Sequence, residues 1–187
     1  MTLLASETLA KSAGDLYLGP TGTGAPAEGD LDDSAALLAA GWVHKGWLDE
    51  AGPRMVGFEG ENTKHFGWNR VPAVRSVTRV TEPMIEVGLL QWNVENLQQY
   101  FPGSTYDAGS GTLTIPEAGN PTDQELLIVV ADGSRYIALW LARTSHRGGG
   151  EIEFPGDGLS SIPVTYDVLA PESGDFFKVI GVDEASS

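Results

Sequence analysis

The feature that most constrains the fold is the hairpin pattern LLIVVADGSRYIALWLAR at residues 126–143. An unbroken apolar run leads into Asp132–Gly133, a residue pair typical of two-residue hairpin turns, and a second run rich in aliphatic and aromatic residues follows. Both runs have the length and composition of β-strands. The sequence therefore predicts a β-hairpin here, turning at Asp132–Gly133, as the strongest local element of the chain.

Other segments also have strand patterns, and 24 glycines and 11 prolines divide the chain into short pieces that favour strands over long helices. The predicted strands lie at 71–82, 84–92, around Leu113 and Ile115, at 150–156 (GEIEFPG) and at 160–170. Two of them alternate clearly, with apolar side chains on one face. These faces are Ile85, Val87 and Leu89 in one strand, and Ile162, Val164, Tyr166 and Val168 in the other.

Two short helices are predicted from their capping residues. In LDDSAALLAAGW, Asp32 or Asp33 can cap a helix that Gly41 ends. In NVENLQQYFPG, Asn93 is placed as the N-cap and Pro102–Gly103 as the stop. Residues 19–30, GPTGTGAPAEGD, have no apolar period and are interpreted as an extended arm, because they lack the lysine of a phosphate-binding loop.

Together these elements predict a mainly β protein: a β-sandwich or half-barrel of about eight strands flanked by one α-helix, with extended N- and C-terminal arms and a long inter-strand loop. A chain of 187 residues suits a single domain. Within 1–187 we expect an N-terminal arm and short helix at 1–40, the sandwich core at 41–170 with its helix at 93–101, and a C-terminal arm at 171–187.

Charge and composition exclude several function classes. The chain has 26 acidic and 11 basic side chains, a formal net charge of −15, and no cysteine. The absence of cysteine removes thiol chemistry and thiolate zinc sites. The acidic balance disfavours tight binding to nucleic acid or to anionic membranes. A surface that DNA must pass without sticking should, however, be acidic or neutral.

No motif predicts catalysis, a metal or a cofactor. His44, His65 and His146 lack the spacings of zinc sites, and no GxSxG occurs. A carboxylate pair for glycoside hydrolysis is not excluded in so acidic a chain. The five tryptophans are expected to pack in the core or at a subunit interface. They are Trp42, Trp47, Trp68, Trp92 and Trp140.

Basic residues concentrate in one stretch of this acidic chain. Between Arg54 and Arg79 there are five basic and two acidic side chains, and residues 52–70 have little apolar period. Long loops of this kind tend to be functional, and opposite charges on identical subunits attract one another head to tail. We therefore predict a subunit interface formed by Arg54, Lys64, His65, Trp68, Arg70, Arg75 and Arg79.

Several segments, in order, resemble the major tail tube proteins of long-tailed (siphovirus-type) bacteriophages, especially those of actinobacterial phages. They are GDLYLGPTGTGAPAE, GWVHKGWLDEAG, ENTKHFGWNRVPAVRSV, MIEVGLLQWNVENLQQYF and SIPVTYDVLA, which together span about residues 13–170. LDEAGPRM departs from the family pattern, which has a serine-containing turn there.

The resemblance implies a structural virion protein without catalysis or cofactor. It implies hexameric rings stacked into a tail tube, which encloses the tape measure protein and then conducts the genome into the cell. The long loop and both arms would contact neighbouring subunits. Further partners would be the tail terminator and distal tail proteins, with assembly in the host cytoplasm and no membrane.

Two other interpretations stay open on the sequence. The chain has the features expected of an inner tube protein of a contractile tail or injection particle, which shares the fold. It is also compatible with a monomeric binding module that uses its tryptophans as a platform for carbohydrate or a cell surface.

Overall fold

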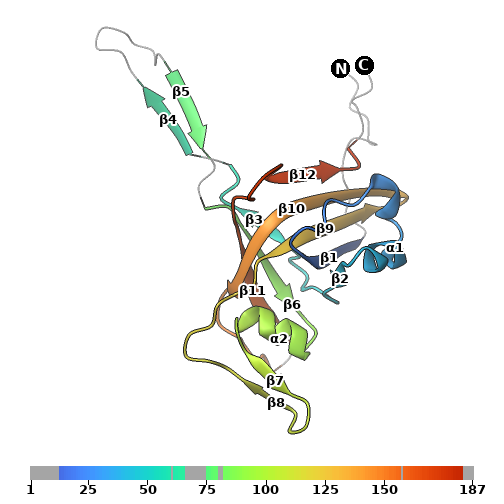
Figure 1. Ribbon diagram of the computed structural model, residues 1–187, viewed down its shortest axis with the longest axis vertical. Helices are drawn as coiled ribbons and strands as arrows, with labels where there is room; N and C mark the ends of the chain where they lie inside the picture. The colour runs from blue at the N-terminus through green and yellow to red at the C-terminus, as the bar shows by residue number, and fades with distance from the viewer. Residues whose placement is uncertain (1–12, 60, 66–74, 80–81, 157, 183–187) are drawn as a thin grey trace.

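The computed structural model describes residues 13–59, 61–65, 75–79, 82–156 and 158–182 (Figure 1). Twelve strands, two α-helices and one 3-10 helix form within these ranges. They are β1 (Ala13–Pro20), η2 (Glu28–Asp30), α1 (Ser34–Ala39), β2 (Val43–His44), β3 (Arg54–Val56), β4 (Glu61–His65), β5 (Arg75–Arg79), β6 (Met84–Leu89), α2 (Val94–Tyr100), β7 (Thr105–Asp107), β8 (Thr112–Thr114), β9 (Gln124–Asp132), β10 (Arg135–Gly148), β11 (Ile162–Val168) and β12 (Phe177–Ile180).

Eight strands form one antiparallel sheet in the order β2-β1-β9-β10-β11-β6-β3, with β12 paired to β10 beside this path. Two further pairs, β4–β5 and β7–β8, are separate two-stranded ribbons. Among the described strands, β2 and β3 end the sheet without pairing to each other, so the barrel is not closed. The prediction of a mainly β, sandwich-type fold is confirmed.

Strand β10 is shared by both halves of this sheet. Its first half pairs with β9 on one side and, at residues 138–141, with β12 on the other. Its second half pairs with β11 from Thr144 to Gly148. The register against β9 shifts between Leu141 and Thr144, which marks a β-bulge that bends the strand. The bend allows the two halves of the sheet to pack against each other.

The main core lies between these two halves. It joins inward side chains of β1 and β9, such as Leu16 and Ile128, to those of β6 and β11. Both apolar faces predicted from alternation are buried there, which confirms those strands. The buried members are Leu16, Leu18, Ile85, Val87, Leu89, Leu126, Ile128, Leu141, Ile162, Val164, Tyr166 and Val168.

A second core covers the opposite face of β1 and β9. Leu127 and Val129 of β9 pack there with Trp140, Leu37 of α1 and Trp42. Burial on both faces explains why residues 126–130 form an unbroken apolar run. Residues 13–20, within the segment predicted as an N-terminal arm and short helix, form β1, which is paired to β9 along its whole length.

Both helices begin at predicted caps. Asp33 Oδ1 accepts hydrogen bonds from the backbone N–H groups of Ala35 and Ala36, at 2.9 and 3.2 Å. Asn93 Oδ1 accepts from the N–H of Asn96 at 2.8 Å, and α2 then runs to Tyr100, one residue short of the predicted end. α2 packs Leu97 and Tyr100 on the main core, as the flanking helix of the prediction should.

Two predicted details are wrong, and the predicted C-terminal arm contains a strand. Asp132 pairs with Arg135, so the turn is Gly133–Ser134, with Gly133 (φ 62°) in the first central position, which favours glycine in type II′ turns. Residues 150–156 form no strand, because glycines and Pro155 interrupt the segment and nothing pairs with it in the described structure. Within the C-terminal arm, Phe177–Ile180 is strand β12.

The GPTGTG segment is fixed to the sheet instead of extending as an arm. The buried carboxylate of Glu125 accepts hydrogen bonds from Gly22 N–H (2.6 Å), Gly24 N–H (2.9 Å) and the indole N–H of Trp140 (2.8 Å). Three converging donors compensate the carboxylate for its lost water. The loop therefore directs its N–H groups at an internal anion.

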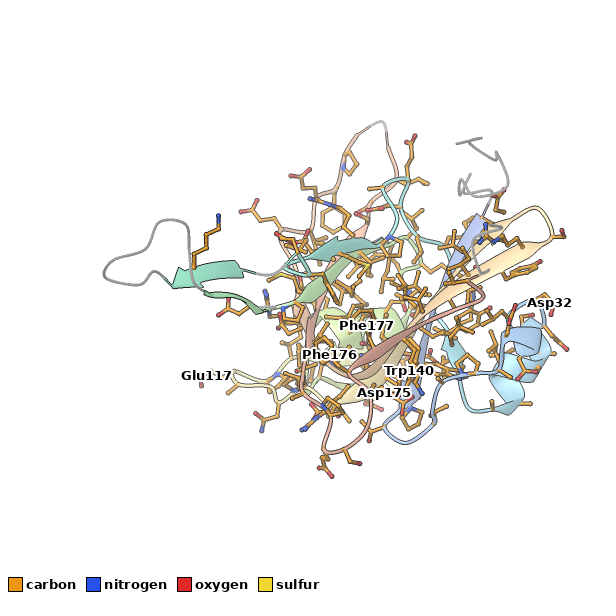
Figure 2. The ribbon with its side chains drawn as sticks, turned by 90° about the horizontal axis from the view of Figure 1, so that it is seen from above. Asp32, Glu117, Trp140, Asp175, Phe176 and Phe177 are labelled. Carbon is orange, nitrogen blue, oxygen red and sulfur yellow. The ribbon has the colours of Figure 1, made fainter. Side chains whose placement is uncertain are left out.

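We expect Glu125→Gln to lower the free energy of unfolding by about 2 kcal/mol, since an amide N–H₂ group would replace one acceptor and face a donor. Urea unfolding of the monomer measures this. Glu117→Gln is the matched control, because Glu117 is exposed in the β8–β9 connection (Figure 2). Equal stability of the two variants would contradict the role of Glu125.

The hydroxyl of Tyr166 is buried in the main core without a hydrogen-bond partner among the described residues. Burial also raises the pKa of this phenol. Because an unsatisfied buried hydroxyl costs about 1–3 kcal/mol, Tyr166→Phe should raise the free energy of unfolding by about 1 kcal/mol. The same urea assay tests this expectation, and a clear loss of stability would show that the hydroxyl has a partner.

Candidate subunit interface

The stretch singled out for its charge forms a ribbon that projects from the body. Strands β4 and β5 pair antiparallel, with Glu61 opposite Arg79 and His65 opposite Arg75. Figure 1 shows this ribbon reaching away from the sheet, at the end of the molecule opposite α2 and the β7–β8 ribbon. A two-stranded ribbon outside the body has little to pack against within its own chain.

The predicted interface residues divide between the ribbon and the sheet edge. Lys64 and His65 lie on β4, with the Lys64 side chain exposed, and Arg75 and Arg79 lie on β5. Trp68 and Arg70, between the two strands in sequence, fall outside the described residues.

Arg54 lies on β3, an end strand of the large sheet, opposite Glu86. Its guanidinium Nη1 is 3.7 Å from Glu86 Oε2, in an exposed ion pair that contributes little to stability. The structure therefore groups four of the predicted residues on the ribbon and places Arg54 on the body.

The long loop predicted at 52–70 is wrong in part, because the segment contains β3 and β4. Its lack of apolar period has a physical reason. β4 pairs with β5 in a two-stranded ribbon separate from the large sheet, and β3 exposes Arg54 and Met55 at the sheet edge. Strands that bury no continuous face need no apolar alternation. The 71–82 strand is confirmed over Arg75–Arg79.

The root of the ribbon has one identifiable anchor and one strained residue. Phe58, just before β4, contacts Phe177 of β12 edge to face, with ring centroids 5.9 Å apart. Phe177 also contacts Phe176, and Figure 2 shows both at the β12 side of the body. After β5, Glu82 has φ 50°, a left-handed conformation that is uncommon without glycine. The chain thus leaves and re-enters the body at defined positions.

Three basic side chains on the body are paired closely with acids of the same chain. Arg147 makes two hydrogen bonds to Asp167, at 2.8 and 3.2 Å, which raise the pKa of the guanidinium. Arg143 donates from Nε to Asp123 at 2.7 Å, and Lys178 lies 2.9 Å from Asp175. These pairs link neighbouring strands and segments of one chain.

A cluster of exposed apolar side chains was not identified from the sequence. The rings of Trp92 and Phe154 are 5.3 Å apart, and Trp92 donates from its indole N–H to the carbonyl of Ser160, next to Leu159. Phe154 and Leu159 are 76% and 78% exposed. The sequence did contain a signal for this cluster, because Phe154 and Leu159 occur in a segment whose glycines and prolines prevent it from forming a buried strand.

Two of the described tryptophans have the predicted core packing, and the predicted interface packing of the others is not tested by a single chain. Trp42 and Trp140 are buried in the second core, whereas Trp47 and Trp92 are exposed. Within the described residues, no group of three or more His, Asp or Glu side chains is arranged to hold a metal ion. No helix in that part of the chain is long and apolar enough to cross a membrane.

The fold and the candidate site define a mainly β, sandwich-type protein whose candidate site is a projecting ribbon. The chain belongs to the phage tail tube protein family, since the model of the family described as "Phage tail tube protein" matches residues 1–187. It is thus a structural protein of the phage virion tail, and its subunits self-assemble into a tube. No curated protein matches the chain.

Proposed function

We propose that the chain polymerises as hexameric rings, which stack into a tube that encloses the tape measure protein and later conducts the genome during ejection. The observation that carries this proposal is the β4–β5 ribbon, which extends beyond the body that the rest of the chain forms (Figure 1). Exposed ribbons gain stability when another surface covers them. An adjacent subunit is the surface available at every position of a tube.

Ring formation is supported by the two unlike ends of the large sheet, β2 and β3. When a surface at one end of a subunit meets a different surface of the next, the contact is heterologous and closes into a ring if the rotation allows. The ribbon then remains free to contact the adjacent ring. We propose that the tail terminator and distal tail proteins cap such a tube, assembled in the host cytoplasm.

Charge supports both contacts between copies and passage of DNA. Six copies of a −15 chain carry 6 × (−15) = −90 formal charges per ring. A basic ribbon is attracted to such an acidic neighbour. Acids facing the lumen would repel the phosphate backbone and keep DNA from adhering, although screening limits this effect to about 8 Å at physiological salt.

We expect Arg70→Glu combined with Arg75→Glu to impair tube polymerisation while leaving the unfolding of the monomer nearly unchanged, because Arg75 lies on β5 and the two described cores include no residue of that strand. Negative-stain microscopy and sedimentation measure polymerisation, and thermal unfolding measures the fold. Arg70→Gln with Arg75→Gln is the matched control that removes the positive charges without adding negative ones. Normal tubes from the charge-reversed variant would exclude the ribbon as an interface.

We further propose that the Trp92–Phe154–Leu159 cluster is buried between copies. Apolar area of this kind is usually covered in a functional assembly, and burial of a large side chain contributes about 1.5–3 kcal/mol. Phe154→Ser should therefore raise the protein concentration needed for polymerisation by at least tenfold.

The stability of the monomer should hardly change in Phe154→Ser, because Phe154 is exposed and its described ring contact is with Trp92. Light scattering over a protein concentration series gives the polymerisation threshold, and Phe154→Tyr, which keeps most of the apolar area, is the control. An unchanged threshold for Phe154→Ser would place this cluster outside the contacts between copies.

A further inference from the structure

Lys45 has a buried side chain in an otherwise acidic protein. It follows β2 directly, and its backbone is fixed on both sides: its N–H donates to Leu16 O at 2.9 Å, and its carbonyl accepts from Asn96 Nδ2 at 3.3 Å. The side chain is only 6% exposed. Lysine is rarely buried to this extent unless its ammonium is paired.

The ammonium of Lys45 is poorly satisfied within the described residues. Its nearest acidic group there is Glu95 Oε2, at 3.7 Å, on a side chain that is 66% exposed. At 3.7 Å this contact is longer than an ordinary hydrogen bond, and an ammonium has three donors to satisfy. A second base, the 6% exposed His146, lies near enough that Lys45 contributes to lowering the pKa of His146.

Lys45 also lines a cavity of about 350 Å³, together with Leu18, Thr21, Val43, Thr122 and Gln124. The cavity lies beside β2, the strand that ends the large sheet. Asp123 is a further lining residue, but its carboxylate is already bound by Arg143. The cavity therefore combines a buried cation with an opening at one end of the sheet.

We propose that this cavity accepts an aspartate or glutamate side chain from a neighbouring copy of the chain, which pairs with the Lys45 ammonium. The inference rests on the proposed assembly into a tube. Charge complementarity supports a second copy as the occupant, since each copy carries 26 acidic side chains against 11 basic ones. A lysine side chain that is 6% exposed and has one long acidic contact costs stability in the monomer, and a carboxylate inserted on assembly offsets that cost.

The first test compares Lys45→Met with the wild type. Methionine keeps the length of the side chain without its charge, so the monomer should unfold at the same temperature or higher. The protein concentration required for polymerisation should rise about tenfold. Lys178→Met is the matched control, because Lys178 is half exposed and paired with Asp175 of its own chain. Polymerisation of Lys45→Met at the wild-type threshold would overturn the proposal.

A second test uses the wild type and does not depend on how the variant folds. Tubes grown from mixed ¹⁴N- and ¹⁵N-labelled chains are treated with a carbodiimide, which links amines to carboxylates in direct contact. Mass spectrometry should then find Lys45 joined to an acidic peptide of the other label. Links confined to a single copy, such as Lys45 to Glu95, would overturn the proposal.

Two further outcomes separate this inference from its alternatives. If inorganic phosphate raises the melting temperature of the wild-type monomer but not that of Lys45→Met, the cavity binds a free anion and the proposal fails. If the wild type forms no tubes, the proposed function fails and takes this inference with it. If wild-type tubes form but Lys45 stays unlinked between copies, only this inference is lost.

Discussion

The bend of β10 is the constraint on which the rest of the structure depends. One strand of 14 residues pairs with β9 and β12 before its bulge and with β11 after it. Because the two halves diverge, Leu141 of β10 and the inward residues of β1 and β9 meet those of β6 and β11 in one core. A straight β10 would hold the same strands in a flat sheet and expose that core. The sandwich, the position of α2 and the root of the ribbon all follow from this bend.

Local patterns predicted the elements that bury one face or end at a cap. Ile85, Val87 and Leu89 alternate because only this face of β6 contributes to the main core, and Asn93 caps α2 because its side chain reaches the N–H of Asn96. Strand β1 was missed because burial on both faces removes alternation. Strand β12 was missed because most of it is exposed and its strand pairing, to β10, joins residues far apart in the sequence. Such strand pairings join segments that are far apart in the sequence, and a local residue pattern does not show which distant segment a strand will pair with.

The candidate site was predictable from charge more than from shape. The concentration of basic residues between Arg54 and Arg79 marked the ribbon, but it also included Arg54, which pairs with Glu86 on the body. The sequence offered no signal for Lys45, because its burial arises where β1 and α2 close over the residue after β2. The composition shows that basic side chains are few in this chain, but only the fold shows that one of them, Lys45, is buried.

Several basic side chains of the body form ion pairs within the chain, whereas Lys45 and the basic ribbon lie at positions that a second copy can reach. Arg143, Arg147 and Lys178 are bound by acids of the same chain, so these bases are already partly neutralised before any contact with a second copy. Lys45 lies in a cavity at the β2 end of the sheet, 3.7 Å from Glu95, and the β4–β5 ribbon, whose sequence includes Lys64, Arg75 and Arg79, reaches away from the body. A subunit built in this way can fold around its cores while Lys45 and the basic ribbon lie at its edges. Association with further copies then adds partners without requiring the core to change.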